Sequence, residues 1–208
     1  CGEVPLVPIS TGTNNVFPAN TEGTLAGIAA GSVATGLVGR DEVCRRSKRI
    51  DIYVDGELRD DALVDAAVSN QMFVGARAVW DTKTLHAMFL TRAEPASIGL
   101  SSIGSRLTPI SIDEECGLYM RLAGEPGPNA TTVRAPIAPG TISEVEILEW
   151  RKIAPGEKID INLQPGTIAL DGEREVELLP DQKVYASLSM DGPWVVDVPK
   201  TMLLTATR

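Results

Sequence analysis

The sequence contains a single histidine, His86, which excludes a metal site built from several histidines of one chain. Three cysteines are present, an odd number, and they are widely spaced without a Cys-x-x-Cys motif: Cys1, Cys44 and Cys116. This pattern favours reduced thiols over a disulfide framework or a zinc site, and we therefore expect a cytoplasmic protein. His86 lies in the apolar segment 85–90, which is typical of an imidazole packed within a strand.

Long apolar runs and a positive net charge are also lacking. No run approaches the ~20 residues that cross a bilayer, and no charged-then-apolar leader opens the sequence, so we expect neither a membrane partner nor secretion. The net charge of −9 argues against a nucleic-acid partner, because phosphate backbones demand a basic surface. One basic cluster spans residues 45–49. Its side chains either lie in solvent at the start of a strand or contact a phosphate or an acidic partner.

The composition that remains is that of a globular protein. With 208 residues, 43% of them apolar, the chain can bury a core as one large domain or as a medium domain with part of another. It begins with Cys1 and reaches the apolar stretch Val4 to Ile9 almost at once, so we expect further residues upstream.

The first 40 residues have α/β character. Residues 4–9 predict a buried strand, a polar loop follows at 10–15, and a helix is expected from Thr21 to about Thr35, closed by Gly36. Glycines at 23, 27 and 31 share one helix face, which predicts that another backbone approaches it closely. We interpret residues 1–40 as a short strand–loop–helix unit of α/β character.

From about residue 48 the apolar periodicity changes to two, which predicts strands at 50–54, 159–163 and 176–178. Asp-Gly pairs at 55–56, 171–172 and 191–192 predict hairpin turns, the last one joining strands at 184–190 and 194–198. A phase shift near Leu148 indicates a bulge, and proline and glycine predict a loop over 124–140. Residues 41–208 therefore predict an antiparallel, mostly β domain of two packed sheets.

The polar loop after the first strand is a candidate anion site. Amides between a strand and a helix can converge on a phosphate, and glycine permits close approach. A plain structural turn is the alternative. The candidate nucleotide-binding residues are Thr11, Gly12, Thr13, Asn14 and Asn15.

The same region resembles a known family. The segment 8–18, Pro-Ile-Ser-Thr-Gly-Thr-Asn-Asn-Val-Phe-Pro, with Glu-Gly-Thr-Leu-Ala-Gly at 22–27, resembles the acetoin-catabolism protein X branch of the ATP-NAD kinase families. The segment 93–104 takes the place of the pocket-lining Thr-Pro-Thr-Gly-Ser-Thr-Ala-Tyr of NAD kinases. Residues 170–173, Leu-Asp-Gly-Glu, are similar to a lipid-kinase motif. The resemblance implies that residues 41–208 form a β-sandwich of NAD-kinase C-terminal type, that residues 1–40 are the remnant of an N-terminal α/β nucleotide-binding domain, and that a nucleotide lies near the loop.

Departures from the family pattern bear on its activity. The Gly-Gly-Asp-Gly motif, whose aspartate is held to activate the acceptor hydroxyl in the family, is absent from this sequence. In the family it belongs to the N-terminal domain, which agrees with the expectation of further residues upstream. The Asn-Glu pair of NAD kinases is replaced by Val64-Asp65, and the pocket tyrosine has no counterpart at residues 100–102. The loss of the amide and of the tyrosine argues against NAD as the acceptor.

Several carboxylates are candidates for the chemistry. Asp171 and Glu173 are either catalytic groups or hairpin-turn residues, and Glu94 either contacts the acceptor or ends a strand. Asp65 interrupts an apolar strand, and burial of a lone carboxylate is costly, so it faces either a cleft or solvent. By the resemblance, Asp65, Glu94 and Ser97 would bind the acceptor.

Two functions stay open. The first is a phosphotransferase that moves a phosphoryl group from ATP or another nucleoside triphosphate, with Mg²⁺, to a hydroxyl of NAD or a related molecule. The second is a non-catalytic nucleotide-binding or regulatory protein of acetoin or related catabolism. In both cases a small-molecule nucleotide is the expected partner, no resident metal site is expected, and the family implies a homo-oligomer.

Overall fold

The computed structural model describes residues 2–11, 16–71, 82–123 and 129–207, and these residues are mostly β, with antiparallel sheets and few helices. The chain divides by its contacts into two compact units. Unit 1 is Cys1–Lys48 with Asp191–Arg208, and unit 2 is Arg49–Met190. Among the described residues no helix is long and apolar enough to cross a membrane.

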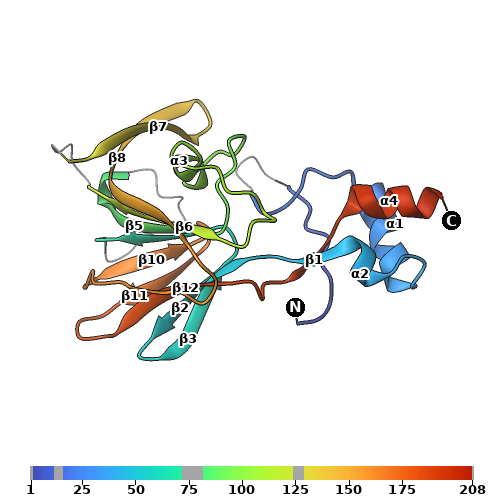
Figure 1. Cartoon of the computed structure of the whole chain (residues 1–208), viewed down its shortest axis with the longest axis horizontal. Coiled ribbons are helices and arrows are strands. Elements are labelled where there is room, and N and C mark those ends of the chain that lie inside the picture. Colours follow the sequence, from blue (N-terminus) through green and yellow to red (C-terminus); the bar gives the residue numbers. More distant parts are fainter. Residues whose placement is uncertain (1, 12–15, 72–81, 124–128, 208) are drawn as a thin grey trace. The chain divides into compact units, whose positions relative to one another are not determined.

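Unit 1 is helical around a small two-stranded sheet. It contains α1 (Gly23–Ala34), α2 (Arg40–Val43), α4 (Val198–Ala206), and the paired strands β1 (Cys44–Arg46) and β13 (Trp194–Val196). Helices α1 and α4 lie side by side (Figure 1). Their contact buries Ala29 and Val198, so the C-terminal residues belong to the same unit as α1, whereas the sequence pattern had grouped them with the β-rich part.

Helix α1 confirms the predicted helix, but its glycine face differs from the prediction. The Glu22 carboxylate caps the helix by accepting from Thr24 N at 2.8 Å, and Gly36 follows its C-terminus with a φ of 73°. The glycines at 23, 27 and 31 are all exposed, and an added Cβ on any of them would meet nothing within 4 Å. Within the described residues, therefore, no backbone approaches this face.

Two predictions at the ends of the chain are wrong. Residues 4–9 form isolated bridges, Leu6 with Val195 and Ile9 with Ala19, instead of a buried strand, and Val4 is 67% exposed. The pair at 191–192 makes no hairpin, because β13 pairs with β1 and not with the preceding strand. Gly192 N instead donates to Ser47 O at 2.9 Å.

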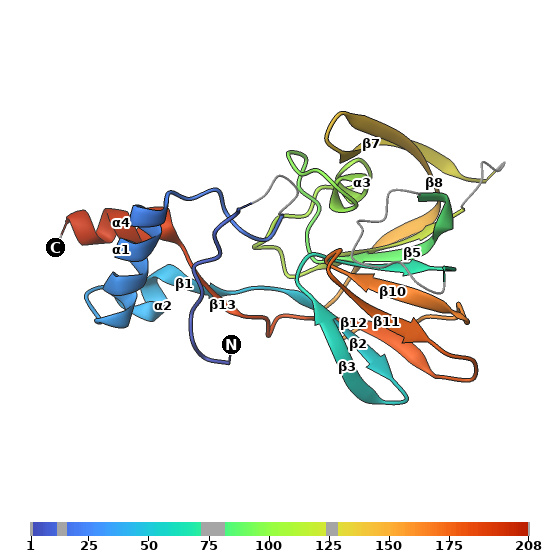
Figure 2. The same ribbon diagram turned by 180° about the vertical axis from the view of Figure 1, so that it is seen from behind.

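Unit 2 contains two antiparallel sheets (Figure 2). The four-stranded sheet has the order β3 (Glu57–Ala62), β2 (Arg49–Val54), β12 (Val184–Ser189) and β9 (Lys158–Asp160). The seven-stranded sheet has the order β11 (Arg174–Leu178), β10 (Gly166–Leu170), β4 (Asp65–Ser69), β5 (Leu85–Leu90), β6 (Gly117–Leu122), β8 (Thr141–Ile153) and β7 (Thr131–Ala138). Two short helices, η1 (Thr82–Thr84) and α3 (Ser101–Ser105), complete the unit.

The central strands β10, β4 and β5 of the seven-stranded sheet are buried on both faces, which explains their apolar sequences. In β5, Phe89 packs in a cluster shared with Ile50 and Ile52 of the four-stranded sheet. Met88 and Leu90 point to the opposite face, where Ile103 of α3 and residues of β6 and β8 form a second cluster. A strand enclosed on both faces loses the polar alternation of a half-exposed strand.

Two of the predicted Asp-Gly turns and the predicted bulge are confirmed by the structure. Asp55-Gly56 and Asp171-Gly172 both take positive φ at each residue and join antiparallel strands. The bulge near Leu148 is confirmed, because Arg121 lies opposite Glu149 and Leu122 opposite Ile147.

The prediction of a loop over 124–140 is wrong for its second half, since β7 runs from Thr131 to Ala138. Strand β7 lies at the edge of its sheet, where Pro136 is tolerated because edge strands have backbone positions without a ladder bond. The predicted strand at 159–163 is shorter than expected and is confined to β9.

Candidate functional site

Three neighbouring strands of the seven-stranded sheet end at one place and bring two predicted aspartates together. Asp65 opens β4 opposite Leu90, and Leu170 closes β10 opposite Ala66. Asp171 N then donates to Asp65 O at 2.9 Å. Antiparallel pairing of β4 between β10 and β5 thus joins residues 106 positions apart in the sequence.

The Asp171 carboxylate binds the segment that leads into β4. It accepts from Leu63 N at 2.8 Å, from Val64 N at 2.7 Å and from Asp65 N at 3.2 Å. Asp171 occupies the left-handed region, with a φ of 53°, a conformation that aspartate tolerates better than most residues. These bonds fix Asp171 beside Asp65.

The electrostatics of the two carboxyl groups differ. Burial, and then the negative charge of Asp171, raise the pKa of Asp65 to about 7 from its ordinary value of 3.8. Burial also raises the pKa of Asp171, but the three amide hydrogen bonds and the charge of Arg174 oppose that rise. Near neutral pH Asp65 therefore exists in both protonation states, as a general acid or base must.

The segment after β5 is tied to the same strand ends. Thr91 N donates to Val64 O at 2.9 Å, and Thr91 Oγ1 donates to Leu63 O at 2.8 Å. Further along, the Ser97 hydroxyl donates to Glu94 O at 2.7 Å and closes a turn. The Glu94 side chain is half-buried, and among the described residues no hydrogen bond joins Glu94 or Ser97 to Asp65.

The remaining predicted residues lie elsewhere or outside the described part of the chain. Glu173 is exposed in the β10–β11 turn. Thr11 is exposed, and Gly12, Thr13, Asn14 and Asn15 lie outside the described residues, so the nucleotide-binding loop stays a prediction.

Sequence reasoning missed Thr91 and the backbone amides of residues 63–65. Thr91 is fully buried and Arg92 is 8% exposed, although both are polar. The sequence could have indicated these two residues, because they are polar and directly follow the apolar run 85–90. The backbone amides could not be found from the sequence, because every residue of this segment has a backbone N–H.

The described residues contain no group of three or more His, Cys, Asp or Glu side chains placed to hold a metal ion. Mg²⁺ in phosphoryl-transfer enzymes is usually held by one or two carboxylates together with substrate phosphates. Asp65 could supply one such ligand, whereas both oxygens of Asp171 already accept amide hydrogens. The pair thus fits a Mg²⁺ ion that arrives with phosphates and not one held by protein alone.

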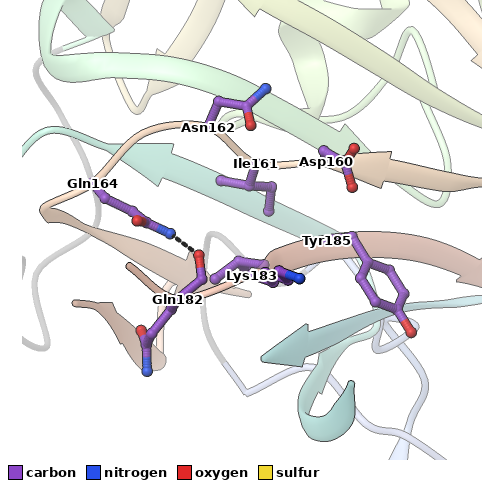
Figure 3. Close-up of a pocket in the computed structure, with 8 residues that line it drawn as sticks. Asp160, Ile161, Asn162, Gln164, Gln182, Lys183 and Tyr185 are labelled. Atoms are coloured by element: carbon purple, nitrogen blue, oxygen red, sulfur yellow. Dashed lines mark hydrogen bonds between the residues drawn. The ribbon is translucent and has the colours of Figure 1, made fainter. Parts of the chain in front are cut away.

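Two recesses of unit 2 are lined by other residues. One, of about 340 Å³, lies along β9 and β12 and is walled by polar side chains including Asp160, Asn162 and Tyr185 (Figure 3). Gln164 donates from its side chain to the Gln182 carbonyl at its margin. The other, of about 830 Å³, lies between the β2–β3 hairpin and β11. Neither is lined by Asp65 or Asp171.

The raised pKa of Asp65 predicts a pH-dependent stability. Between about pH 4 and 7 the folded chain holds a proton that the unfolded chain has released, so the free energy of unfolding falls as the pH rises through this window. A pKa near 7 in place of 3.8 corresponds to at most about 4 kcal/mol. Because Asp65 keeps some exposure, we expect about 1–3 kcal/mol.

Asp65→Asn removes this titration, so the variant should gain stability relative to the natural chain at pH 8 and gain little or nothing at pH 4. Urea denaturation at the two pH values measures the difference. Asp181→Asn, at an exposed aspartate with positive φ, is the control and should give the same difference at both. An equal effect of Asp65→Asn at pH 4 and pH 8 would refute the assignment.

Comparison with known proteins identifies the family. The model of the acetoin catabolism protein X C-terminal domain matches residues 48–191. Acetoin catabolism protein X of Cupriavidus necator H16 is 41% identical over 206 residues, which cover 97% of this chain and 57% of that protein. The chain therefore spans little more than half the length of this relative, and it belongs to the acetoin catabolism protein X family, whose C-terminal domain it carries at residues 48–191.

Proposed function

We propose that the protein takes part in phosphoryl transfer from a nucleoside triphosphate to a hydroxyl group of a small molecule, with Asp65 as the general base. The observation that carries the proposal is the pair at the strand ends. Asp171 is fixed there by three amides, and Asp65 is left beside it with a pKa of about 7.

The chemistry follows from that pair. As the acceptor oxygen forms a bond to the γ-phosphorus, the bond from that phosphorus to the β–γ bridging oxygen breaks, and a nucleoside diphosphate leaves. The hydroxyl proton passes to Asp65 Oδ. Burial, and then the negative charge of Asp171, make Asp65 a stronger base than a solvated carboxylate, so proton transfer to it near neutral pH becomes more favourable.

Other residues have supporting roles in this proposal. Residues 11–15 stay predicted as the nucleotide-binding loop, and Mg²⁺ bound to the phosphates of the triphosphate would neutralise charge. Glu94 and Ser97, on the segment that Thr91 anchors to the strand ends, contact the acceptor. The name of the relative supports an acceptor from acetoin or related catabolism.

A non-catalytic nucleotide-binding or regulatory role is the second candidate. It is favoured by Val64, which stands where NAD kinases carry an amide side chain, and by residues 100–102, where their pocket tyrosine has no counterpart. In this role the Asp65–Asp171 pair would serve only to hold the strand ends.

Transfer of ³²P from γ-labelled ATP distinguishes the two functions. The chain and the longer Cupriavidus necator relative are each incubated with Mg²⁺, labelled ATP and a panel of hydroxylated acceptors that includes NAD and acetoin. We expect a labelled organic product in addition to inorganic phosphate. Saturable ATP binding without any labelled product from either protein would contradict the catalytic proposal and support the regulatory one.

A further inference from the structure

Three donors of unit 1 converge on one carboxylate. Arg40 Nη2 donates to Glu3 Oε2 at 2.8 Å, and Trp194 Nε1 donates to the same oxygen at 3.2 Å. Arg46 Nη2 donates to the other oxygen, Oε1. The donors come from α2, β1 and β13, so the fold of unit 1 gathers two guanidinium groups and an indole N–H around a single anion.

The donors are held in place without Glu3. Both guanidinium groups lie over the Trp194 ring, Arg40 at 4.4 Å and Arg46 at 5.0 Å from its centroid. Arg46 sits opposite Trp194 in the β1–β13 pair, and its Nη1 also binds Asp191 at 2.9 Å and Gly192 O at 3.1 Å. Removal of the Glu3 carboxylate would therefore leave the three donors positioned.

Glu3 itself is an accessible occupant. Its side chain is 69% exposed, and its segment is anchored separately at Leu6, whose N donates to Trp194 O at 2.8 Å and whose O accepts from Val196 N at 2.9 Å. The hydrogen bond from Arg40 lowers the pKa of Glu3, so the side chain is ionised at neutral pH. The carboxylate can leave without breaking the backbone bonds of Leu6.

We propose that Arg40, Arg46 and Trp194 form an oxyanion-binding site that Glu3 fills from within the chain, and that a carboxylate or phosphate group of a small ligand enters when Glu3 leaves. Guanidinium forks suit both groups because each offers paired oxygens. One of the three residues, Arg46, belongs to the basic cluster 45–49 of an otherwise acidic chain. It is independent of Asp65 and of the proposed phosphoryl transfer.

The test replaces Glu3 by glutamine, which removes the charge and keeps the side-chain size. Acetate and inorganic phosphate are titrated separately at constant ionic strength, and binding is followed by the Trp194 indole N–H resonance, assigned with Trp194→Phe. We expect saturable shifts in Glu3→Gln with an apparent Kd at least tenfold lower than in the natural chain. Tighter binding of phosphate assigns the site to phosphorylated ligands, and tighter binding of acetate to carboxylates.

Two variants control the test. Glu173→Gln, at an exposed glutamate of unit 2, should bind like the natural chain. Arg40→Gln combined with Glu3→Gln should abolish the saturable shift, while the Leu6 amide keeps its hydrogen-exchange protection and so reports an intact unit. Equal affinity in Glu3→Gln and the natural chain, or a shift that survives the loss of Arg40, overturns the proposal and leaves Glu3 as a structural ion pair.

Discussion

Replacement of Asp65 with asparagine is expected to lower kcat for phosphoryl transfer by about 10²–10⁴-fold, the usual contribution of a general base. Asparagine keeps the shape of the side chain but cannot accept the hydroxyl proton. In the natural protein the rate should rise with pH through about 7, as Asp65 loses its proton, and this rise should be missing from the residual activity of the variant. Initial rates between pH 5.5 and 8.5 measure both effects.

The matched control for that prediction is Asp181→Asn, which removes one carboxylate from an exposed position. Its rates and pH profile should equal those of the natural protein. If Asp65→Asn retains full activity with an unchanged profile, Asp65 is not the base. A raised KM with an unchanged kcat would instead limit Asp65 to binding.

Asp171→Ala is expected to lower the free energy of unfolding by about 3–5 kcal/mol, because three backbone N–H groups at residues 63–65 lose their acceptor. Alanine is also strained at a φ of 53°. For a chain of this size the loss corresponds to about 10 °C in Tm. Thermal unfolding followed by circular dichroism checks the value.

A second Asp-Gly turn isolates the backbone contribution. Asp55 has the same φ of 53°, but its carboxylate accepts from one amide, Lys183 N at 3.0 Å. Asp55→Ala should therefore cost about 1–2 kcal/mol. Equal losses for Asp55→Ala and Asp171→Ala would show that the turn conformation, and not the amide cluster, accounts for the effect.

The parts of the fold that depend on neighbouring residues could be predicted from the sequence. The mostly β, antiparallel character follows from alternating apolar residues, and the turns at 55–56 and 171–172 follow from residues that tolerate positive φ. The bulge at Leu148 was visible as a phase shift within one strand. Each of these signals is contained in a segment of about ten residues.

Pairing between distant segments could not be predicted in the same way. Asp191-Gly192 has the same residues as the two true hairpin turns, yet its following strand pairs with Cys44–Arg46. The sequence marks Asp65 as a candidate because a carboxylate interrupts an apolar strand, but its proximity to Asp171 depends on β10 pairing with β4. The apolar periodicity within a strand does not show which other strand pairs with it.

The pairing of β2 with β12 has a consequence for how unit 2 can be inserted or deleted during evolution. Arg49 and Ser189 are partners in that ladder, and just outside it Ser47 N donates to Pro193 O at 3.0 Å. The polypeptide thus enters and leaves unit 2 through adjoining positions. Because its two ends lie side by side, unit 2 can be inserted, deleted or circularly permuted as a single piece while the chain path of unit 1 is kept.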